Sequence, residues 1–411
     1  MRLLVGYSQG LPVYLTDKQL RTHLHGIGLS QQGKSKLIQF LCSQLIKLGK
    51  PFCLIDPHFT LYADLLNWLA YNHYSKPTVL FNPSYWKRIV GLNPFVSPYT
   101  DVARLMTKAE RLVTSVLRIW GAENPNQYSN IERWLRCIFY TILEQQLSIG
   151  NLRFFIYWHY KDERERIVGR LKSQSIRDQL TDFYSVKDWK FRQDIQTTGN
   201  KLQKFIHPQM QRIMGLRDNN INLETIIEQR QVLLCNFQAA EDELIGQENT
   251  RVLGTLLLSE FWESFRKRSK PTEFYLIIDE CHLFLGPDIQ QILTESAKYG
   301  LHLCLFHQHE EQIRNIAGAM KNAQTKIIFS GEDSPKEQRN FTLRLPNHET
   351  VNVRVPEIPA RHVSPDRLDA YVESLTRNFL TCDQVDERLN PPKTEDTPQG
   401  FGTWKAKPKT S

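Results

Sequence analysis

The sequence predicts an α/β protein with a largely parallel sheet, into which an all-α domain is inserted. Short apolar runs of strand length alternate with helical patterns over residues 1–99 and again over residues 228–335. Most of these runs are continuously apolar, which is typical of strands whose two faces are both covered by helices. Between them, residues 100–227 have helical periodicity almost throughout and contain no convincing strand. These observations together predict a doubly wound sheet with a helical insert.

The elements of the α/β part follow one another in a regular order. Apolar residues recur at helical spacing after residue 34, and Gly49 and Pro51 then end that helix. Within the insert, Ile131, Leu135 and Phe139 share one helical face. The predicted strands are residues 12–15, 22–27, 51–56, 77–81, 231–237, 273–279, 301–306 and 325–330, and the helices between them are residues 34–48, 61–71, 249–268, 289–299 and 310–323.

The last part of the chain differs in composition from the rest. Residues 336–385 are predicted to form a C-terminal extension with a hairpin, residues 341–345 against 351–355, and a helix over 364–378. Residues 386–411 are rich in Pro, Lys and Thr. This composition predicts a disordered basic tail.

Composition limits the class of protein. With 41% hydrophobic and 23% charged residues in a chain of 411, the protein is expected to be globular with two or three domains. No apolar run approaches 20 residues and no signal peptide is present, so we expect no membrane anchor. The seven scattered cysteines indicate a reducing compartment, and a cytoplasmic location is predicted. The net charge of +8 suits a polyanionic partner.

Residues 28–35 fit the phosphate-loop pattern G-x-x-x-x-G-K-[ST]. In such a loop, backbone N–H groups at the start of a helix hold the phosphates. The Lys34 ammonium would reach the β- and γ-oxygens, and the Ser35 hydroxyl would be a ligand of Mg²⁺. The predicted nucleotide-binding residues are Gly28, Leu29, Ser30, Gln31, Gln32, Gly33, Lys34 and Ser35.

The loop departs from the usual pattern at one place. Where such loops commonly have another glycine, this chain has Gln31 and Gln32. Only glycine adopts positive φ without strain, and a side chain here could also crowd the phosphates. We therefore expect slower turnover but not weaker binding.

A second motif supplies the acidic groups that the loop lacks. The apolar run over residues 274–278 ends in Asp279 and Glu280. A buried strand would deliver Asp279 to the metal and leave Glu280 to polarise an attacking water. The alternative is that this pair only caps the end of a strand and has no catalytic role. Together with the loop, the pair predicts hydrolysis of Mg·ATP, with Lys34 and Glu280 as catalytic residues.

Other polar residues have an open or a purely structural interpretation. Asp56, at the end of a neighbouring strand, could orient the site or only face the edge of the sheet. His307 and His309 point the same way on a strand, but no further ligands are placed near them, so no metal is expected there. The basic residues of the insert, Lys201 and Arg212 among them, fit solvated helix faces better than DNA contacts.

Several further segments resemble the HerA/FtsK superfamily of DNA-pumping ATPases, and within it the cytoplasmic domains of conjugative coupling proteins. The resemblance covers roughly residues 10–335 and lies in Leu11-Pro12-Val13-Tyr14-Leu15, His23-Leu24-His25-Gly26, Leu54-Ile55-Asp56-Pro57-His58, Gly91-Leu92-Asn93-Pro94-Phe95, Tyr299-Gly300-Leu301-His302-Leu303 and Phe306-His307-Gln308. It implies a RecA-like (ASCE) P-loop ATPase core, and it makes Gln308 a third catalytic residue, which senses the γ-phosphate.

The resemblance also implies a function and partners. It predicts an ATP-driven DNA translocase that self-associates into a ring, a hexamer by family expectation, with DNA as substrate and a secretion channel, relaxase, capsid or nuclease as further partner. Genome packaging or defence is an alternative, and so is a nucleotide-gated scaffold with little turnover. Ala297 stands where the family has an arginine that reaches a neighbouring subunit, and Lys298 and Arg314 are alternative sources of that cation.

Overall fold

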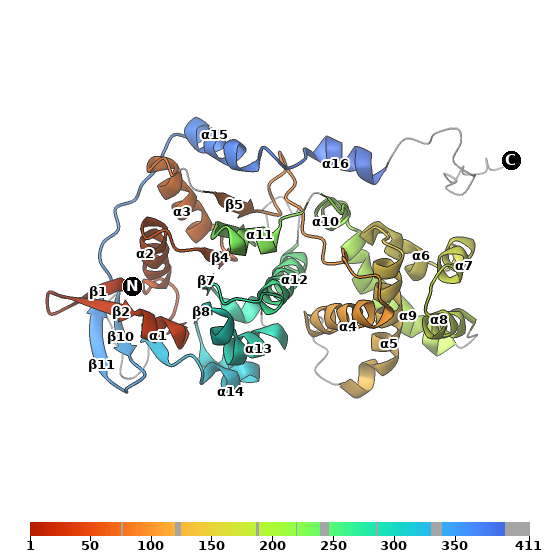
Figure 1. The fold of residues 1–411 in the computed structure, drawn as a ribbon, viewed down its shortest axis with the longest axis horizontal. Coiled ribbons are helices and arrows are strands. Elements are labelled where there is room, and N and C mark those ends of the chain that lie inside the picture. The colour runs from red at the N-terminus through yellow and green to blue at the C-terminus, as the bar shows by residue number, and fades with distance from the viewer. Residues whose placement is uncertain are drawn as a thin grey trace, which may run out of the picture.

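The computed structural model describes residues 1–74, 77–119, 125–185, 189–218, 220–238, 246–284, 287–329 and 339–390. In these residues one mixed sheet of 11 strands runs in the order β2-β1-β11-β10-β9-β3-β8-β7-β4-β6-β5. Helices cover both faces of the sheet, and a further group of helices lies beyond one of these covering layers (Figure 1). The α/β class with a helical insert is confirmed.

Seven of the described strands form the parallel part of the sheet. Within this group, each strand pairs in parallel with its neighbours. Every residue of β4, β6, β7 and β8 is buried, as the continuously apolar runs predicted. The seven are β3 (Leu24–Ile27), β4 (Phe52–Asp56), β5 (Thr78–Phe81), β6 (Val232–Asn236), β7 (Phe274–Ile278), β8 (Leu301–His307) and β9 (Thr325–Ile328).

The other four described strands extend the sheet antiparallel, and here the prediction differs from the structure. β1 (Arg2–Ser8) was not predicted; it pairs with β2 (Leu11–Thr16) and with β11 (Thr350–Arg354). The predicted hairpin of β10 (Asn340–Arg344) and β11 is not a separate extension, because β10 continues the sheet beside β9. The hairpin therefore belongs to the same sheet as the phosphate loop.

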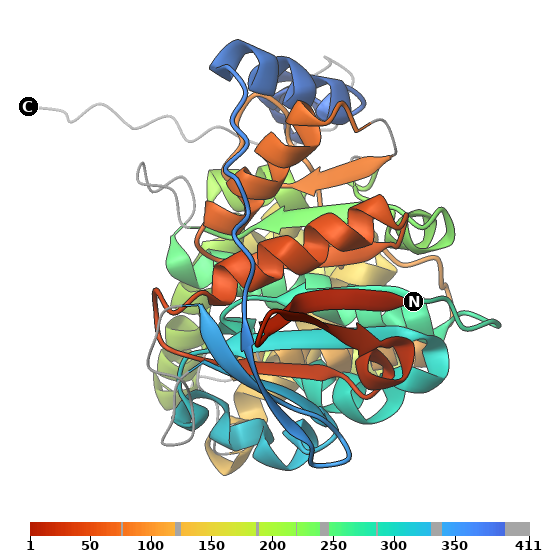
Figure 2. The ribbon, with the colours of Figure 1, turned by 90° about the vertical axis from the view of Figure 1, so that its left-hand side faces the viewer.

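The two faces of the sheet carry different helices and two hydrophobic cores. α2 (Lys34–Lys47) and α3 (Thr60–Tyr71) cover one face, in front of the strands in Figure 2. α12 (Gln247–Arg266) and α13 (Pro287–Glu295) cover the other. Along β4 the side chains alternate between the two cores, as the pleat of a strand requires. Shorter elements are α1 (Asp17–Arg21), α14 (Ala317–Met320) and the 3-10 turns η1 (Ile149–Leu152), η2 (Gln203–Ile206), η3 (Cys281–Phe284), η4 (Ser296–Tyr299) and η5 (Glu310–Ile316).

Among the described residues between 100 and 227, the named elements of the insert are all α-helices or short 3-10 turns. Its core is continuous with the core on the α12 face of the sheet. The contact runs through α4 and α12, where Arg111 pairs with Glu260 at 2.9 Å and also with Glu263. The helices are α4 (Val102–Ile119), α5 (Pro125–Glu144), α6 (Arg153–Ile156), α7 (Lys161–Gly169), α8 (Gln174–Ser185), α9 (Trp189–Leu202), α10 (Pro208–Met214) and α11 (Leu223–Glu228).

After β11 the chain crosses to the opposite edge of the sheet (Figure 2). There α15 (Pro365–Thr376) packs on α3 and β5, and α16 (Cys382–Leu389) packs on α10. The predicted disordered tail from residue 386 therefore begins too early, because Asp386 lies within α16 and pairs with Arg212 at 2.6 Å. Residues 391–411 of the predicted tail lie outside the described residues. Within the described part of the chain, no helix is long and apolar enough to span a bilayer.

The close packing of β3 against β8 gives a test of the fold. A Cβ built on Gly26 would lie 2.2 Å from a ring carbon of the buried Phe306. We expect Gly26→Ala to lower the free energy of unfolding by about 1–3 kcal/mol, the usual effect of overpacking a core. Urea unfolding followed by circular dichroism measures this. Gly318→Ala is the control, because a methyl group added there would have nothing within 4 Å. Equal unfolding midpoints for the two variants would contradict the expectation.

Candidate nucleotide-binding site

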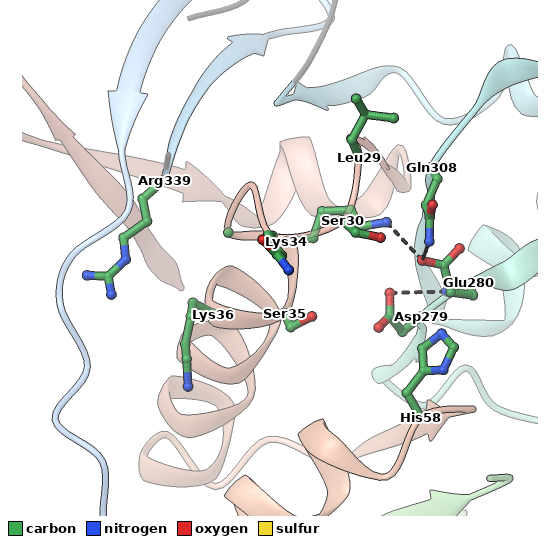
Figure 3. Close-up of a pocket in the computed structure, with 12 residues that line it drawn as sticks. Leu29, Ser30, Lys34, Ser35, Lys36, His58, Asp279, Glu280, Gln308 and Arg339 are labelled. Carbon is green, nitrogen blue, oxygen red and sulfur yellow. Dashed lines mark hydrogen bonds and ion pairs between the residues drawn. The ribbon is translucent and has the colours of Figure 1, made fainter. Parts of the chain in front are cut away.

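The phosphate loop lies at the carboxyl edge of the parallel strands. Ile27, the last residue of β3, pairs with His307 on β8 and with Ile328 on β9, so these strands end side by side. A cavity of about 320 Å³ opens at this edge (Figure 3). Its lining residues are Leu29, Ser30, Gln31, Gly33, Lys34, Ser35, Lys36, His58, Asp279, Glu280, Gln308 and Arg339. Apart from Gly28 and Gln32, the predicted site residues all line this one cavity.

The loop backbone explains its glycines and the role of its glutamines. Gly33 begins α2 at φ +110°, and a Cβ on Gly28 would lie 2.5 Å from Phe329. Gln31 takes the left-handed conformation at φ +65°, which is the strain expected where a glycine is missing. Gln32 instead braces the loop: its side-chain Oε1 accepts the N–H of Leu29 at 3.1 Å. The second glutamine therefore supports the loop and does not line the cavity.

Three side chains from three elements meet in the cavity. The Lys34 ammonium donates to Oε1 of Glu280 at 3.0 Å, and the Gln308 amide donates to the same oxygen at 2.9 Å. Only 6% of the Lys34 side chain and 5% of the Glu280 side chain are exposed. Burial would raise the pKa of Glu280, but the Gln308 hydrogen bond and the Lys34 charge outweigh it and lower that pKa. A phosphate group that recruits Lys34 must therefore compete with Glu280.

Asp279 is the second carboxyl at the end of β7. Burial raises its pKa to about 7, although the Lys34 charge opposes the rise. Its Oδ1 accepts the backbone N–H of Glu280 at 3.1 Å. A divalent cation beside this carboxyl would favour its charged form. The Ser35 hydroxyl, which lines the same cavity, offers a second hard oxygen, so the donor set fits Mg²⁺, which takes few protein ligands beside phosphate oxygens and water.

A series of contacts that was not predicted surrounds Glu280 and Gln308. Gln312 Oε1 accepts the backbone N–H groups of Gln308 at 3.0 Å and His309 at 2.9 Å. Its amide nitrogen faces His282 Nε2 at 3.3 Å, and His282 Nδ1 lies 3.5 Å from Glu280 Oε2. The Gln312 amide can donate to Nε2. Among the described residues, His282 Nδ1 and Glu280 Oε2 are buried without a hydrogen-bond partner, so the series of contacts does not close into a ring. No local pattern in the sequence marks His282 or Gln312.

The histidines near the site act as neutral groups between strands. His25 on β3 and His307 on β8 are stacked with ring centroids 4.9 Å apart, and their Nε2 atoms are 2.6 Å apart. Burial lowers the pKa of His25 to about 3 and that of His307 to about 4, and each lies near other groups that favour its neutral form. His307 Nδ1 faces the carbonyl oxygen of His309 at 3.0 Å. The pair links β3, which leads into the loop, to β8, which ends just before Gln308.

Asp56, whose role the sequence leaves open, has a clear place. Its carboxylate accepts the backbone N–H of His58 at 2.8 Å and that of Tyr62 at 2.8 Å. It thus shapes the turn from β4 into α3 and does not line the cavity, whereas His58, which follows it, does. Asp56 therefore stabilises the turn that carries His58 at the edge of the cavity, without lining the cavity itself.

The candidate sources of a cation for a neighbouring subunit lie away from this cavity. Ala297 and Lys298 are exposed in η4, where Lys298 pairs with Glu295 at 3.0 Å. The Arg314 side chain in η5 is 79% exposed and lies 3.9 Å from Glu311. The three positions are thus on the surface, and their role between subunits stays a prediction.

Comparisons with known proteins identify the fold. No protein-family profile and no curated protein matches the sequence. The bacterial conjugative coupling protein TrwBdeltaN70 superposes with a TM-score of 0.61 at 13% identity, over 89% of this chain and 92% of that one. Plasmid coupling protein TrwB in complex with ADP and Mg²⁺ gives 0.54 at 15% identity, over 90% and 84%. VirB4 of Thermoanaerobacter pseudethanolicus gives 0.52 at 14% identity, over 87% and 96%. The RecA-like P-loop ATPase fold is therefore confirmed, as is the resemblance at the level of the fold.

The Lys34 contact gives a test of the site. We expect Lys34→Ala to abolish binding of ATP, because its ammonium is the cation that the loop presents to the β- and γ-phosphates. Calorimetric titration with a non-hydrolysable ATP analogue measures this. Removing one partner of a buried ion pair also costs about 3–5 kcal/mol of stability, so the melting temperature is recorded in parallel. Ser35→Ala, which leaves the ion pair intact, should weaken binding only when Mg²⁺ is present. Tight binding by a folded Lys34→Ala variant would contradict the assignment.

Proposed function

We propose that this protein is an ATP-driven DNA translocase of the HerA/FtsK type, which hydrolyses Mg·ATP as a ring, expected to be a hexamer. The observation that carries the proposal is the meeting of Lys34, Glu280 and Gln308 in one cavity at the head of α2. If the pair between Lys34 and Glu280 only stabilised the fold, no phosphate loop would be needed beside it. The carboxylate, the ammonium and the amide are the groups that phosphoryl transfer to water requires.

The residues divide the chemistry among them. Lys34 leaves Glu280 for the β- and γ-phosphate oxygens, and the freed carboxylate takes a hydrogen bond from the attacking water and polarises it. Gln308 contacts Glu280 and would sense the γ-phosphate, as the coupling-protein likeness implies. Ser35 and Asp279 would hold Mg²⁺, which would neutralise charge on the phosphates. Gln312 accepts the backbone N–H groups of Gln308 and His309 and so positions Gln308.

The DNA substrate and the ring are supported by the fold and the charge of the chain. The fold is shared with a conjugative coupling protein over most of both chains, although the identity is only 13%. The net charge of +8 suits a polyanion. A relaxase or secretion-channel partner follows from the coupling-protein likeness, whereas a capsid or nuclease partner would mark the packaging or defence alternative.

A nucleotide-gated scaffold with little turnover is the second candidate function. Two observations favour it: Gln31 strains the loop at φ +65°, and Ala297 offers no cation to a neighbouring subunit. An arginine finger is worth about 10³–10⁵ in kcat in phosphoryl transfer. The scaffold and the motor differ in whether DNA accelerates hydrolysis.

Glu280→Gln separates binding from catalysis. The amide keeps the shape of the side chain and loses the carboxylate, so ATP should remain bound while kcat falls by roughly 10²–10⁴, the usual contribution of a general base. Phosphate release measured beside calorimetric binding tests both halves. Glu349→Gln, a change of the same chemistry in the exposed turn between β10 and β11, is the control. Parental turnover in Glu280→Gln would move catalysis to another residue.

A salt series tests the DNA substrate. If the protein grips the phosphate backbone, log Kd for DNA should rise steeply and linearly with log salt concentration, since each neutralised phosphate releases counterions. Fluorescence anisotropy with a labelled duplex and a labelled single strand measures this, and the same DNAs are added to the hydrolysis assay. Stimulated hydrolysis in the parent but not in Glu280→Gln supports the motor. Binding without stimulation, or no binding at low salt, favours the scaffold.

A further inference from the structure

The cavity has a second end that the chemistry of the γ-phosphate does not use. Glu280 lies at one end, and Arg339, from the turn before β10, lies at the other. Figure 3 shows Arg339 on the far side of the phosphate loop from Glu280 and Gln308, beyond Lys36. A nucleotide whose γ-phosphate reaches Glu280 must direct its remaining half along the loop. That half then lies toward Arg339.

The backbone of Arg339 is hydrogen-bonded to the phosphate loop. Its N–H donates to the carbonyl of Gln32 at 2.8 Å, and its own carbonyl accepts the N–H of Val355 at 2.9 Å. A Cβ on Gly33 would lie 3.0 Å from the Cα of Arg339, so the two segments touch at a glycine. Arg339 is held in the left-handed region at φ +67°. Such strain in a residue other than glycine gathers at ligand sites, where surrounding contacts maintain it.

Among the described residues, the guanidinium of Arg339 is held only weakly. It lies 3.2 Å from Glu357, but 39% of the arginine side chain and 87% of the glutamate side chain are exposed. An ion pair so open to water contributes little and is readily exchanged. Lys34 pairs with the buried Glu280, and Lys36, whose side chain is 44% exposed, pairs at 3.0 Å with Asp64, which is 25% exposed. Of these three described cations, Arg339 thus has the partner most open to water.

We propose that Arg339 binds the nucleoside half of the nucleotide, with its planar guanidinium against the base. A guanidinium stacks on a flat π-system, which a lysine ammonium does not reproduce. The inference rests on the proposed function because it takes ATP as the ligand. The inference adds a contact to the base of the nucleotide. This contact comes from the antiparallel hairpin and not from the parallel strands.

Arg339→Gly tests the contact without disturbing the loop. Glycine accepts the left-handed backbone and keeps the N–H that bonds Gln32, so only the side chain is lost. Calorimetric titrations use three probes: ADP, a non-hydrolysable ATP analogue, and inorganic tripolyphosphate, which has no nucleoside. We expect the first two to weaken by the same factor, about tenfold or more, as for loss of one stacked or charge-assisted contact. Tripolyphosphate should bind as it does to the parent.

Two further variants sharpen the result. Arg339→Lys keeps the positive charge but loses the planar guanidinium, so ADP binding should be weakened in this variant too. Arg354→Ala removes an exposed charge from β11 of the same hairpin and should leave all three probes unchanged. Unchanged ADP binding in Arg339→Gly, or an equal loss for tripolyphosphate, overturns this inference alone. A folded parent that binds none of the three probes overturns the proposed function together with it.

Discussion

A buried ion pair between Lys34 and Glu280 joins the two halves of the site. One half is the loop at the head of α2, and the other is the carboxyl end of β7, 246 residues later in the chain. Two charges so buried are favourable only with good geometry and further hydrogen bonds. Gln308 supplies one such bond, and Gln312 in turn accepts the backbone N–H of Gln308. The structure thus holds the Lys34 ammonium on the Glu280 carboxylate, and in the proposed function nucleotide would take that cation over.

The backbone around the cavity is strained at several points, and hydrogen bonds maintain that strain. Gln31, Phe59, Glu280 and Arg339 are all left-handed residues other than glycine, and each lines the cavity or neighbours a residue that does. Each such conformation costs on the order of 1–3 kcal/mol. For Glu280, whose φ is +44°, the consequence is direct: the turn after β7 sends its carboxylate back toward Lys34 instead of onward along the strand.

The parts of the molecule that sequence reasoning found are those that local patterns encode. The parallel strands are continuously apolar because both their faces are buried, and the loop and the Asp279-Glu280 pair are contiguous motifs. β1 was missed although its main partner β2 follows it directly, because a register shift between Leu4 and Gly6 interrupts its pattern and its other partner, β11, lies more than 300 residues away. The second half of α16 was taken for tail because what holds it, the pairing of Asp386 with Arg212, is long-range. Tertiary structure alone brings His282, Gln312 and Arg339 to the site. No spacing of residues in the sequence could therefore predict them.

The sheet and the insert share one hydrophobic core, which constrains how the insert can respond to the site. α12 leads into β7, the strand that ends just before Asp279, and α4 of the insert is tied to α12 by Arg111 with Glu260 and by Lys108 with Glu260 at 3.4 Å. Ile278 and Cys281, on either side of the Asp279-Glu280 pair, belong to the same core as α12 and α4. Close-packed cores shift between discrete arrangements and do not deform smoothly. The insert and the carboxyl end of β7 are therefore parts of one close-packed unit.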